Sequence, residues 1–363
     1  MKILIDIGHP AHVHLYRNFY REMKDRGHSL YVTVKNMPSA TKLLDLYGIP
    51  YTLTGAKGDT LTSKGIRQVL FSLKLAGKAG RLGIDIGLGS SISLAHASKL
   101  CRMKSIIFDD DDDQVQPLMT RYGHPFADLI VSPSSLRNAR ASSKALFYPG
   151  YHELAYLYPS RFTPDPGVLK DAGVSPGEPF FIMRFNAFRA HHDRGVVGLS
   201  ASQKLELVKL LEPRGRVFIT TEAEIEPELT NYRLKISPDK AHSLLSYATM
   251  FIGDSQTMTS EAAVLGVPAL RCNTLAGSIS YLRDQEETYG LTYAYKPSEF
   301  DRFREKLCSL LETPQLREEW QRRRSLMLSD MIDVTAFMVW LAETFGKKER
   351  MSDFREIDFN RFR

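Results

Sequence analysis

The sequence predicts an α/β protein with two Rossmann-like domains, and three observations lead to this fold class. Short β-rich runs alternate with longer helical patterns along the chain, which is typical of parallel sheets covered by helices. Turn residues concentrate between two well-patterned halves, at 158–159, 163–167 and 175–179. The length of 363 residues exceeds one ordinary core and fits two domains of about 150–180 residues each.

Residues 1–160 form the expected first domain, and 161–179 the expected linker. The strands of the first domain are expected at 2–7, 29–34, 84–88, 104–108, 129–131 and 145–148. Its helices are expected at 13–26, 39–47, 61–81, 92–100 and 114–122.

Residues 180–345 form the expected second domain. Its strands are expected at 180–184, 216–220, 250–252 and 269–271, and its helices at 203–211, 241–247, around Glu261, and at 300–311, 315–328 and 334–345. We expect the two domains to face one another across a cleft, with ligands at the carboxyl ends of the strands. The tail, 346–363, has no clear periodicity and is either a packed or a disordered end.

The composition is that of a soluble globular protein, with 43% hydrophobic and 25% charged residues. No apolar run approaches the roughly 18–20 residues that span a bilayer, and the first residues form a strand rather than a signal peptide. We therefore expect a cytoplasmic protein. Cys101, Cys272 and Cys308 are too widely spaced for a disulfide framework or a zinc knuckle, so each is expected to be a buried small hydrophobe.

The net charge of +6 suits an acidic substrate or an anionic surface. Because no known DNA- or RNA-binding signature is present, we expect no nucleic-acid partner. The basic residues of 61–81 fall within one arc of the expected helix, with Phe71 and Leu75 close to that arc. This pattern is compatible with a peripheral contact with the inner face of a membrane, but it more often marks a solvated face over a packed one.

The most informative segment is 253–268. An apolar run ends in Gly253-Asp254-Ser255, a helical pattern follows, and Gly266-Val267-Pro268 leads into a second apolar run. The free N–H groups at the start of such a helix can hold a diphosphate, and Glu261 could accept hydrogen bonds from ribose hydroxyls. The alternative is an ordinary βαβ unit with a solvated Glu261.

This segment resembles the sugar-nucleotide site of GT-B enzymes, which include glycosyltransferases and UDP-N-acetylglucosamine 2-epimerases. Ser255, Thr257 and Glu261 match the donor-binding positions of that pattern, and Gln256 lies among them. The resemblance implies a GT-B-like fold whose C-terminal helices cross back onto the first domain. The string His-Pro-Ala-His-Val-His at 9–14 is closer still to an uncharacterised prokaryotic family of this fold.

The loop after the first expected strand contains Gly8, His9, His12 and His14. One glycine does not make a dinucleotide fingerprint, so NAD binding is disfavoured. A histidine can take a proton from an acceptor hydroxyl. The resemblance places the functional histidine at His12, with His14 and His9 as the next candidates. They could instead cap or pack the helix.

Two further strand exits in the first domain carry candidates for substrate binding. Ser90 lies in a glycine-rich loop, 87–91, whose amides could hold an anionic group. Five aspartates follow the strand 104–108, and Asp109 or Asp110 could orient a histidine or bind sugar hydroxyls, with Asp109 as a catalytic candidate and Asp110 as a substrate-binding one. The alternatives are a plain turn and a solvated acidic loop.

In the second domain, Arg184 ends the first expected strand and could neutralise a departing diphosphate. His191 and Asp193 would then lie near the sugar, whereas His242 is expected to pack within its helix. A metal site that joins the N-terminal histidines to 191–193 or to the acidic run 109–113 is the other reading, but the spacings do not reproduce the i, i+4 zinc motif, so no metal is expected.

We therefore expect a glycosyltransferase that moves a sugar from a nucleotide-diphosphate sugar, a UDP-sugar first, to a lipid-linked or saccharide acceptor of the cell surface. No cofactor is expected, since a helix dipole and an arginine can supply the positive charge. A 2-epimerase is the first alternative, although Gln256-Thr257-Met258 and Asn273-Thr274-Leu275 replace its two acids and its Thr-Glu-Arg. A non-catalytic nucleotide-sugar-binding protein is the second.

Overall fold

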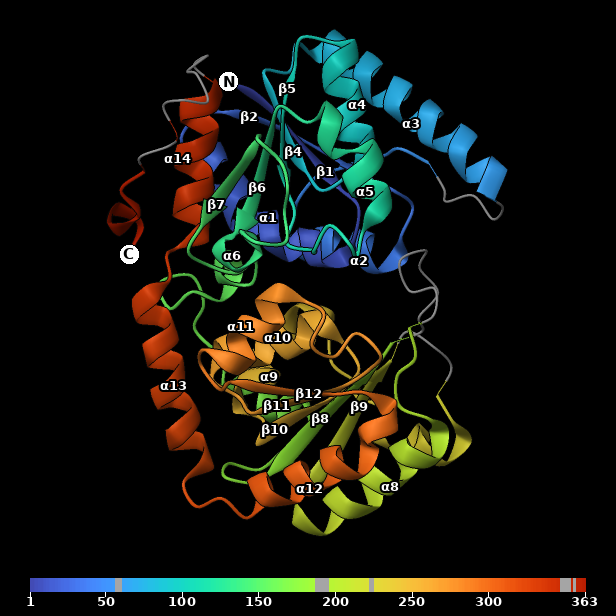
Figure 1. Cartoon of the computed structure of the whole chain (residues 1–363), viewed down its shortest axis with the longest axis vertical. Coiled ribbons are helices and arrows are strands. Elements are labelled where there is room, and N and C mark those ends of the chain that lie inside the picture. The colour runs from blue at the N-terminus through green and yellow to red at the C-terminus, as the bar shows by residue number, and fades with distance from the viewer. Residues whose placement is uncertain (56–60, 187–195, 222–224, 347–353, 355–356) are drawn as a thin grey trace. The chain divides into compact units, whose positions relative to one another are not determined.

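The computed structural model describes residues 1–55, 61–186, 196–221, 225–346, 354 and 357–363, with no side-chain description for 61–66. The chain divides into two compact units. Unit 1 consists of Met1–Arg161 and Met331–Arg363, and unit 2 of Phe162–Asp330. Each unit contains one parallel sheet with flanking helices, which confirms the predicted α/β class (Figure 1). The borders differ from the expected ones, because the expected linker lies almost wholly within unit 2.

Unit 1 contains a seven-stranded sheet in the order β3-β2-β1-β4-β5-β6-β7, in which neighbouring strands are parallel. The strands are β1 (Lys2–Ile7), β2 (Ser29–Val34), β3 (Thr52–Leu53), β4 (Ile86–Gly89), β5 (Lys104–Phe108), β6 (Leu129–Pro133) and β7 (Ala145–Tyr148). The central strands are mostly buried and rich in apolar residues, as expected for a parallel sheet whose two faces are covered by helices (Figure 1).

The helices of unit 1 are α1 (Pro10–Asp25), α2 (Pro38–Leu46), α3 (Leu61–Leu82), α4 (Ile92–Leu100), α5 (Pro117–Tyr122), α6 (Leu154–Leu157) and α14 (Val334–Gly346). The last of these packs against α1 and α6, as the expected crossing-back of the C-terminal helices requires. Thr335 Oγ1 donates to the Ala155 carbonyl at 2.7 Å, and Arg161 Nε donates to Asp333 at 2.7 Å. The segment Leu316–Gly346 is long and apolar enough to cross a membrane by composition alone, but 61% of its most apolar stretch is buried inside the protein.

Unit 2 contains a five-stranded parallel sheet in the order β12-β11-β10-β8-β9. The strands are β8 (Phe180–Phe185), β9 (Arg216–Thr221), β10 (Met250–Gly253), β11 (Ala269–Cys272) and β12 (Thr292–Tyr295). The helices are α7 (Gly167–Asp171), α8 (Ala201–Leu211), α9 (Ala241–Tyr247), α10 (Gln256–Leu265), α11 (Ser280–Glu287), α12 (Phe300–Leu311) and α13 (Leu316–Asp330). The sequence did not predict α11 or β12. Most residues of α11 are polar, so the buried Tyr281 and Leu282 do not stand out as an apolar pattern.

The glycine-rich loop expected at 87–91 is mostly strand. β4 runs through Gly89, so that only Ser90 and Ser91 form the turn. The glycines are needed for close packing, because a Cβ on Gly87 would lie 2.7 Å from the Leu94 side chain and one on Gly89 would lie 2.8 Å from the Asp6 carbonyl oxygen.

The basic helix α3 also differs from expectation in the face that it buries. Leu75, placed near the basic arc, is buried at 2% exposure, whereas Val69, Leu70 and Leu73 are about half exposed. The buried side is formed by small and apolar residues, including Ala76 and Ala79 of the unit 1 core.

Candidate functional site

The loop after β1 brings His9 and His12 together beside Gly8. His9 caps α1 by accepting the Ala11 N–H at Nδ1, 3.2 Å away. His12 lies in the first turn of α1, and its Nδ1 accepts the Gly8 N–H at 3.2 Å. Burial, with His9 and His152 nearby, lowers the pKa of His12 to about 3 despite the opposing charges of Asp110 and Asp109. At neutral pH His12 is therefore an uncharged imidazole with its proton on Nε2.

His14 lies within the interior of unit 1. Its side chain is buried, and its Nδ1 forms a hydrogen bond with the Tyr47 hydroxyl at 3.1 Å. Its ring also packs on Tyr156, with 5.4 Å between the ring centroids. Arg17 donates to the same Tyr47 hydroxyl at 2.8 Å. These contacts give His14 a packing role in place of the catalytic role considered from the sequence.

The β4 exit provides two serines with local partners. Ser91 caps α4 by accepting the Leu94 N–H at 3.1 Å, and its hydroxyl donates to the buried Asp6 carboxylate. Ser90 Oγ donates to the Phe108 carbonyl oxygen and thereby joins the β4 exit to the β5 exit. The structure thus places Ser90 beside the aspartate run, at the same edge of the sheet.

Asp109, expected to be catalytic, interacts through its carboxylate with two buried side chains, those of His124 and Arg140. Its Oδ2 lies 2.7 Å from His124 Nε2 and 3.0 Å from Arg140 Nη1. The Arg140 side chain has no exposed surface. Burial by itself would raise the pKa of the Asp109 carboxyl, but the His124 hydrogen bond and the Arg140 charge outweigh it and hold this pKa below its ordinary value. Asp109 is therefore a structural carboxylate.

Asp110 forms a different pair, with a residue that the sequence analysis missed. Its Oδ2 lies 3.1 Å from His152 Nδ1. His152 follows β7 and is 9% exposed, and its Nε2 has no hydrogen-bond partner among the residues that the structure describes. The available signal was its position just beyond the expected strand 145–148, because strand exits of one parallel sheet share an edge.

The negative charges of the three consecutive carboxyl groups at this edge are each balanced or avoided in a different way. One oxygen from each of Asp109, Asp110 and Asp111 lies within 4.8 Å of the others. Burial, followed by the charges of Asp110 and Asp109, raises the pKa of Asp111 well above its ordinary value, so that this group retains a proton at mildly acidic pH. Arg140 and His124 compensate Asp109, and His152 compensates Asp110.

In unit 2, the β10–α10 junction has the expected strand–turn–helix geometry. Ser255 caps α10 by accepting the Met258 N–H at 3.4 Å, and the first turn of the helix begins with Gln256 and Thr257. Gly253 is required where β10 meets β8, because a Cβ at this position would lie 2.2 Å from the Arg184 carbonyl oxygen. The backbone N–H groups that open α10 can therefore bind an anion at the carboxyl edge of this sheet.

Glu261 lies in the second turn of α10 and is buried rather than solvated. Its Oε1 lies 2.8 Å from Nε2 of His242, which is itself buried on α9. The expectation that His242 only packs in its helix misses this bond. Phe162 lies edge-on to the histidine ring, with 6.4 Å between the ring centroids. A carboxylate held in this way has a fixed orientation, as a ribose-binding group needs.

Arg184 and Asp254 complete the β8 and β10 exits. Arg184 Nη1 donates to Thr220 Oγ1 at 3.4 Å, and Asp254 Oδ1 accepts the Asn186 N–H at 2.7 Å. Burial raises the pKa of Asp254 to about 7, against the opposing Asn186 hydrogen bond and the charges of Lys204 and Arg184. An uncharged carboxyl at this point would not repel a bound anion.

A buried arginine lies at the next strand exit. Arg271, 2% exposed, donates to Asn273 Oδ1 at 3.2 Å, and Asn273 Nδ2 donates to the Asp254 carbonyl oxygen at 2.8 Å. Burial lowers the pKa of Arg271 to about 10, so it remains cationic at neutral pH. The proposed sugar contacts His191 and Asp193, with His192, lie outside the described residues.

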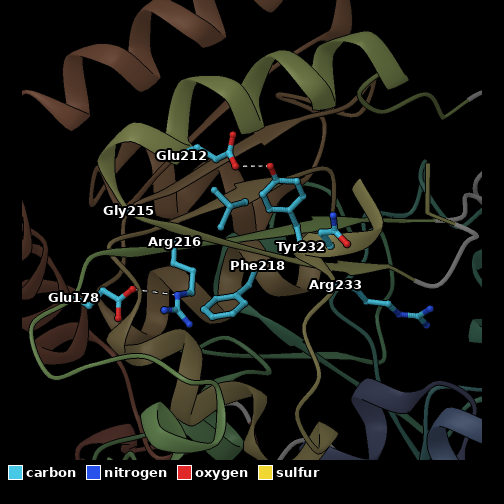
Figure 2. A pocket seen from close by; sticks show the side chains of 9 residues that line it. Glu178, Glu212, Gly215, Arg216, Phe218, Tyr232 and Arg233 are labelled. Atoms are coloured by element: carbon cyan, nitrogen blue, oxygen red, sulfur yellow. Dashed lines mark hydrogen bonds and ion pairs between the residues drawn. The ribbon is translucent and has the colours of Figure 1, made fainter. Parts of the chain in front are cut away.

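A surface pocket of about 580 Å³ in unit 2 does not coincide with these groups. Figure 2 shows its lining, where Glu178 pairs with Arg216 and Glu212 accepts from the Tyr232 hydroxyl. Arg216 is the first residue of β9, so the pocket lies at the amino end of the strand, opposite to the α10 junction. Because the pocket lies away from the candidate site residues, we assign it no role in ligand binding.

Comparisons with solved structures agree with this two-unit fold. A UDP-N-acetylglucosamine 2-epimerase from Neisseria meningitidis, bound to UDP-N-acetylglucosamine, is 14% identical and has a TM-score of 0.68, with 96% of this chain and 100% of that chain covered. The S. aureus protein MnaA in complex with UDP has the same TM-score at 10% identity, covering 96% and 97%. The glycosyltransferase VinC in complex with DTDP is 14% identical with a TM-score of 0.63, covering 96% and 100%. The fold is thus GT-B-like.

Sequence comparison gives a family rather than an activity. An uncharacterized protein of Methanocaldococcus jannaschii is 22% identical over 303 residues, which cover 79% of this chain and 86% of that protein. A family model described as "Protein of unknown function (DUF354)" matches residues 1–290. The chain therefore belongs to the DUF354 family, on a GT-B-like fold.

Proposed function

We propose that this protein is a glycosyltransferase that moves a sugar from a UDP-sugar to a saccharide or lipid-linked acceptor of the cell surface. The observation that carries the proposal is the β10–α10 junction, where the opening N–H groups of a helix and a buried, oriented Glu261 lie on one element. The UDP and UDP-N-acetylglucosamine named with two structural neighbours favour a uracil nucleotide as the first ligand to test.

In this proposal the diphosphate binds at the N-terminus of α10, near Ser255 and Thr257, and Arg184 offsets the charge that develops on the leaving group. Glu261 accepts hydrogen bonds from the ribose, while His242 fixes its carboxylate. The sugar–phosphate bond breaks with its electron pair going to the diphosphate. The helix dipole and Arg184 supply the stabilising charge within unit 2.

Nucleotide binding is measured by thermal shift against nucleotides and nucleotide sugars. A ligand at 100 times its Kd stabilises the folded state by about 2.7 kcal/mol, which raises the Tm of a domain of about 170 residues by about 7 °C. Glu261→Gln should abolish most of the shift. Glu286→Gln is the matched control, because Glu286 is a partly buried carboxylate of the same unit, and it accepts the Ala294 N–H at 3.1 Å. If no nucleotide shifts the wild-type Tm, the proposal is wrong.

A 2-epimerase of the same fold is the second candidate, favoured by the TM-score of 0.68 to the Neisseria meningitidis epimerase against 0.63 to the transferase VinC. An epimerase needs no acceptor. Incubation with UDP-N-acetylglucosamine alone, followed by product analysis, separates the two activities. A second UDP-sugar in the product would identify the epimerase, whereas free UDP whose release is accelerated by an added acceptor, together with a glycosylated acceptor, would identify the transferase.

A further inference from the structure

The carboxyl edge of the unit 1 sheet holds two imidazoles in opposite hydrogen-bonding states. His12 receives the Gly8 N–H at Nδ1, so the proton of its neutral ring is on Nε2. His152 has the reverse arrangement, because a carboxylate oxygen lies 3.1 Å from its Nδ1 and can only accept. Its Nδ1 therefore holds a proton, and the lone pair of the neutral ring is on Nε2.

The free nitrogen of each ring determines which proton transfer that ring can perform. His12 presents an N–H and can only donate, since its single lone pair already accepts from the backbone. His152 presents a lone pair at Nε2, which has no hydrogen-bond partner among the described residues. A buried imidazole nitrogen without a hydrogen-bond partner is unfavourable, and a bound hydroxyl would relieve this by donating to it.

We propose that His152, rather than His12, is the base that takes the proton of the acceptor hydroxyl, with Asp110 as its positioning residue. The assignment rests on the proposed transferase function. In the step, the acceptor O–H bond breaks and its proton moves to His152 Nε2. The oxygen forms a bond to the anomeric carbon as the sugar–phosphate bond breaks and the diphosphate leaves with the electron pair. His152 later returns the proton to solvent.

The charges around His152 support a base that works near neutral pH. Burial lowers its pKa, but the charge and hydrogen bond of Asp110, with the charges of Glu153 and Asp109, raise it above the ordinary value. His12 on α1 is uncharged at neutral pH. Tyr148 on β7 is held neutral, because burial and the charges of Asp110 and Glu153 raise its pKa well above the ordinary value. Asp110 therefore both orients the ring and stabilises the imidazolium that forms.

The orientation is tested by ¹⁵N NMR of the histidine rings in the full-length protein, assigned with His152→Gln and His12→Gln. We expect His152 to be protonated at Nδ1 and His12 at Nε2 when neutral. Asp110→Asn should shift the titration of His152 to lower pH, because the carboxylate raises its pKa. Protonation of neutral His152 at Nε2, or a titration that Asp110→Asn does not move, would overturn the dyad.

The catalytic role is tested by UDP release from the UDP-sugar that gives the largest thermal shift, with water as acceptor. His152→Gln should lower turnover at least about 100-fold with UDP binding unchanged, and His12→Gln should lower it less than about tenfold. Asp110→Asn should lower kcat and move the acid limb of the pH profile to lower pH. If His152→Gln turns over like the wild type, the assignment of His152 as the base is wrong, while the proposed transferase function is unaffected. If the wild type binds no UDP-sugar, the transferase function fails, and the base role with it.

Discussion

Asp109→Asn tests whether the first carboxylate of the aspartate run is structural. The substitution keeps the size of the side chain and removes its charge from a site where Arg140 has no exposed surface and His124 lies 2.7 Å away. Breaking a buried pair of this kind costs about 3–5 kcal/mol, because an uncompensated charge remains in the interior. Asp113 still lies 3.4 Å from Arg140 Nε, so we expect the lower end, about 3 kcal/mol.

The loss is measured as a change in Tm. Unit 1 has about 190 residues, for which the unfolding entropy is about 0.4 kcal/mol/K, so 3 kcal/mol lowers Tm by about 7 °C. The pH dependence follows from the lowered pKa of Asp109. The stabilisation is fully present above the ordinary carboxyl pKa and is lost as the pH falls through the folded-state value, so the difference between wild type and variant should vanish in strong acid.

Asp111→Asn is the matched control, two residues away. Because the pKa of Asp111 is raised well above its ordinary value, its ionisation opposes folding at neutral pH. The variant should therefore be at least as stable as the wild type. A Tm of Asp109→Asn within about 2 °C of the wild type, with loss of turnover, would refute the structural interpretation and return Asp109 to the list of catalytic candidates.

Three further predictions concern other parts of the chain. Asp254→Asn should flatten the dependence of the free energy of unfolding on pH. A carboxyl with a folded-state pKa of about 7 makes the wild type lose up to about 4 kcal/mol of stability as the pH rises from about 4 to about 7. Urea unfolding at acid and alkaline pH checks this. Gly253→Ala should unfold or strongly destabilise unit 2, since its Cβ would lie 2.2 Å from the Arg184 carbonyl oxygen, and circular dichroism during heating would show it. Replacing the exposed Val69 and Leu73 of α3 by serine should reduce co-sedimentation with anionic vesicles, relative to the same change at the exposed Leu326.

The sequence was sufficient for the fold because the strands of a parallel sheet are continuous apolar runs. It was weakest where polar residues fold into regular structure. The segment 280–287 reads as polar, yet Tyr281 and Leu282 anchor it as α11. Strand glycines were similarly misleading, since Gly89 was expected in a loop and instead ends β4, where the Asp6 carbonyl oxygen leaves no space for a Cβ.

The candidate site was predictable in location but not in pairing. Positions such as Ser90, Asp110 and Glu261 follow from strand exits and from the helix after a phosphate-sized turn. Which side chains then meet depends on contacts between segments that are distant in sequence. His152 lies 42 positions beyond Asp110, and no local sequence pattern indicates that the two side chains form an ion pair. The tautomer of His12 likewise follows from its hydrogen bond with the Gly8 N–H, and the sequence alone does not predict it.

The composition of unit 1 from two separate stretches of chain has a consequence for biosynthesis. Its sheet is covered by α14, where Phe337 packs on Tyr148 with 5.5 Å between the ring centroids, so residues 1–161 lack part of their core until residues 331–346 have been made. At about 5–20 residues per second, a ribosome needs roughly 10–35 s to synthesise the intervening unit 2. Unit 2 is continuous in sequence and can fold during that interval. Synthesis of unit 1 therefore begins before that of unit 2, but unit 1 can complete its core only after unit 2 has been made.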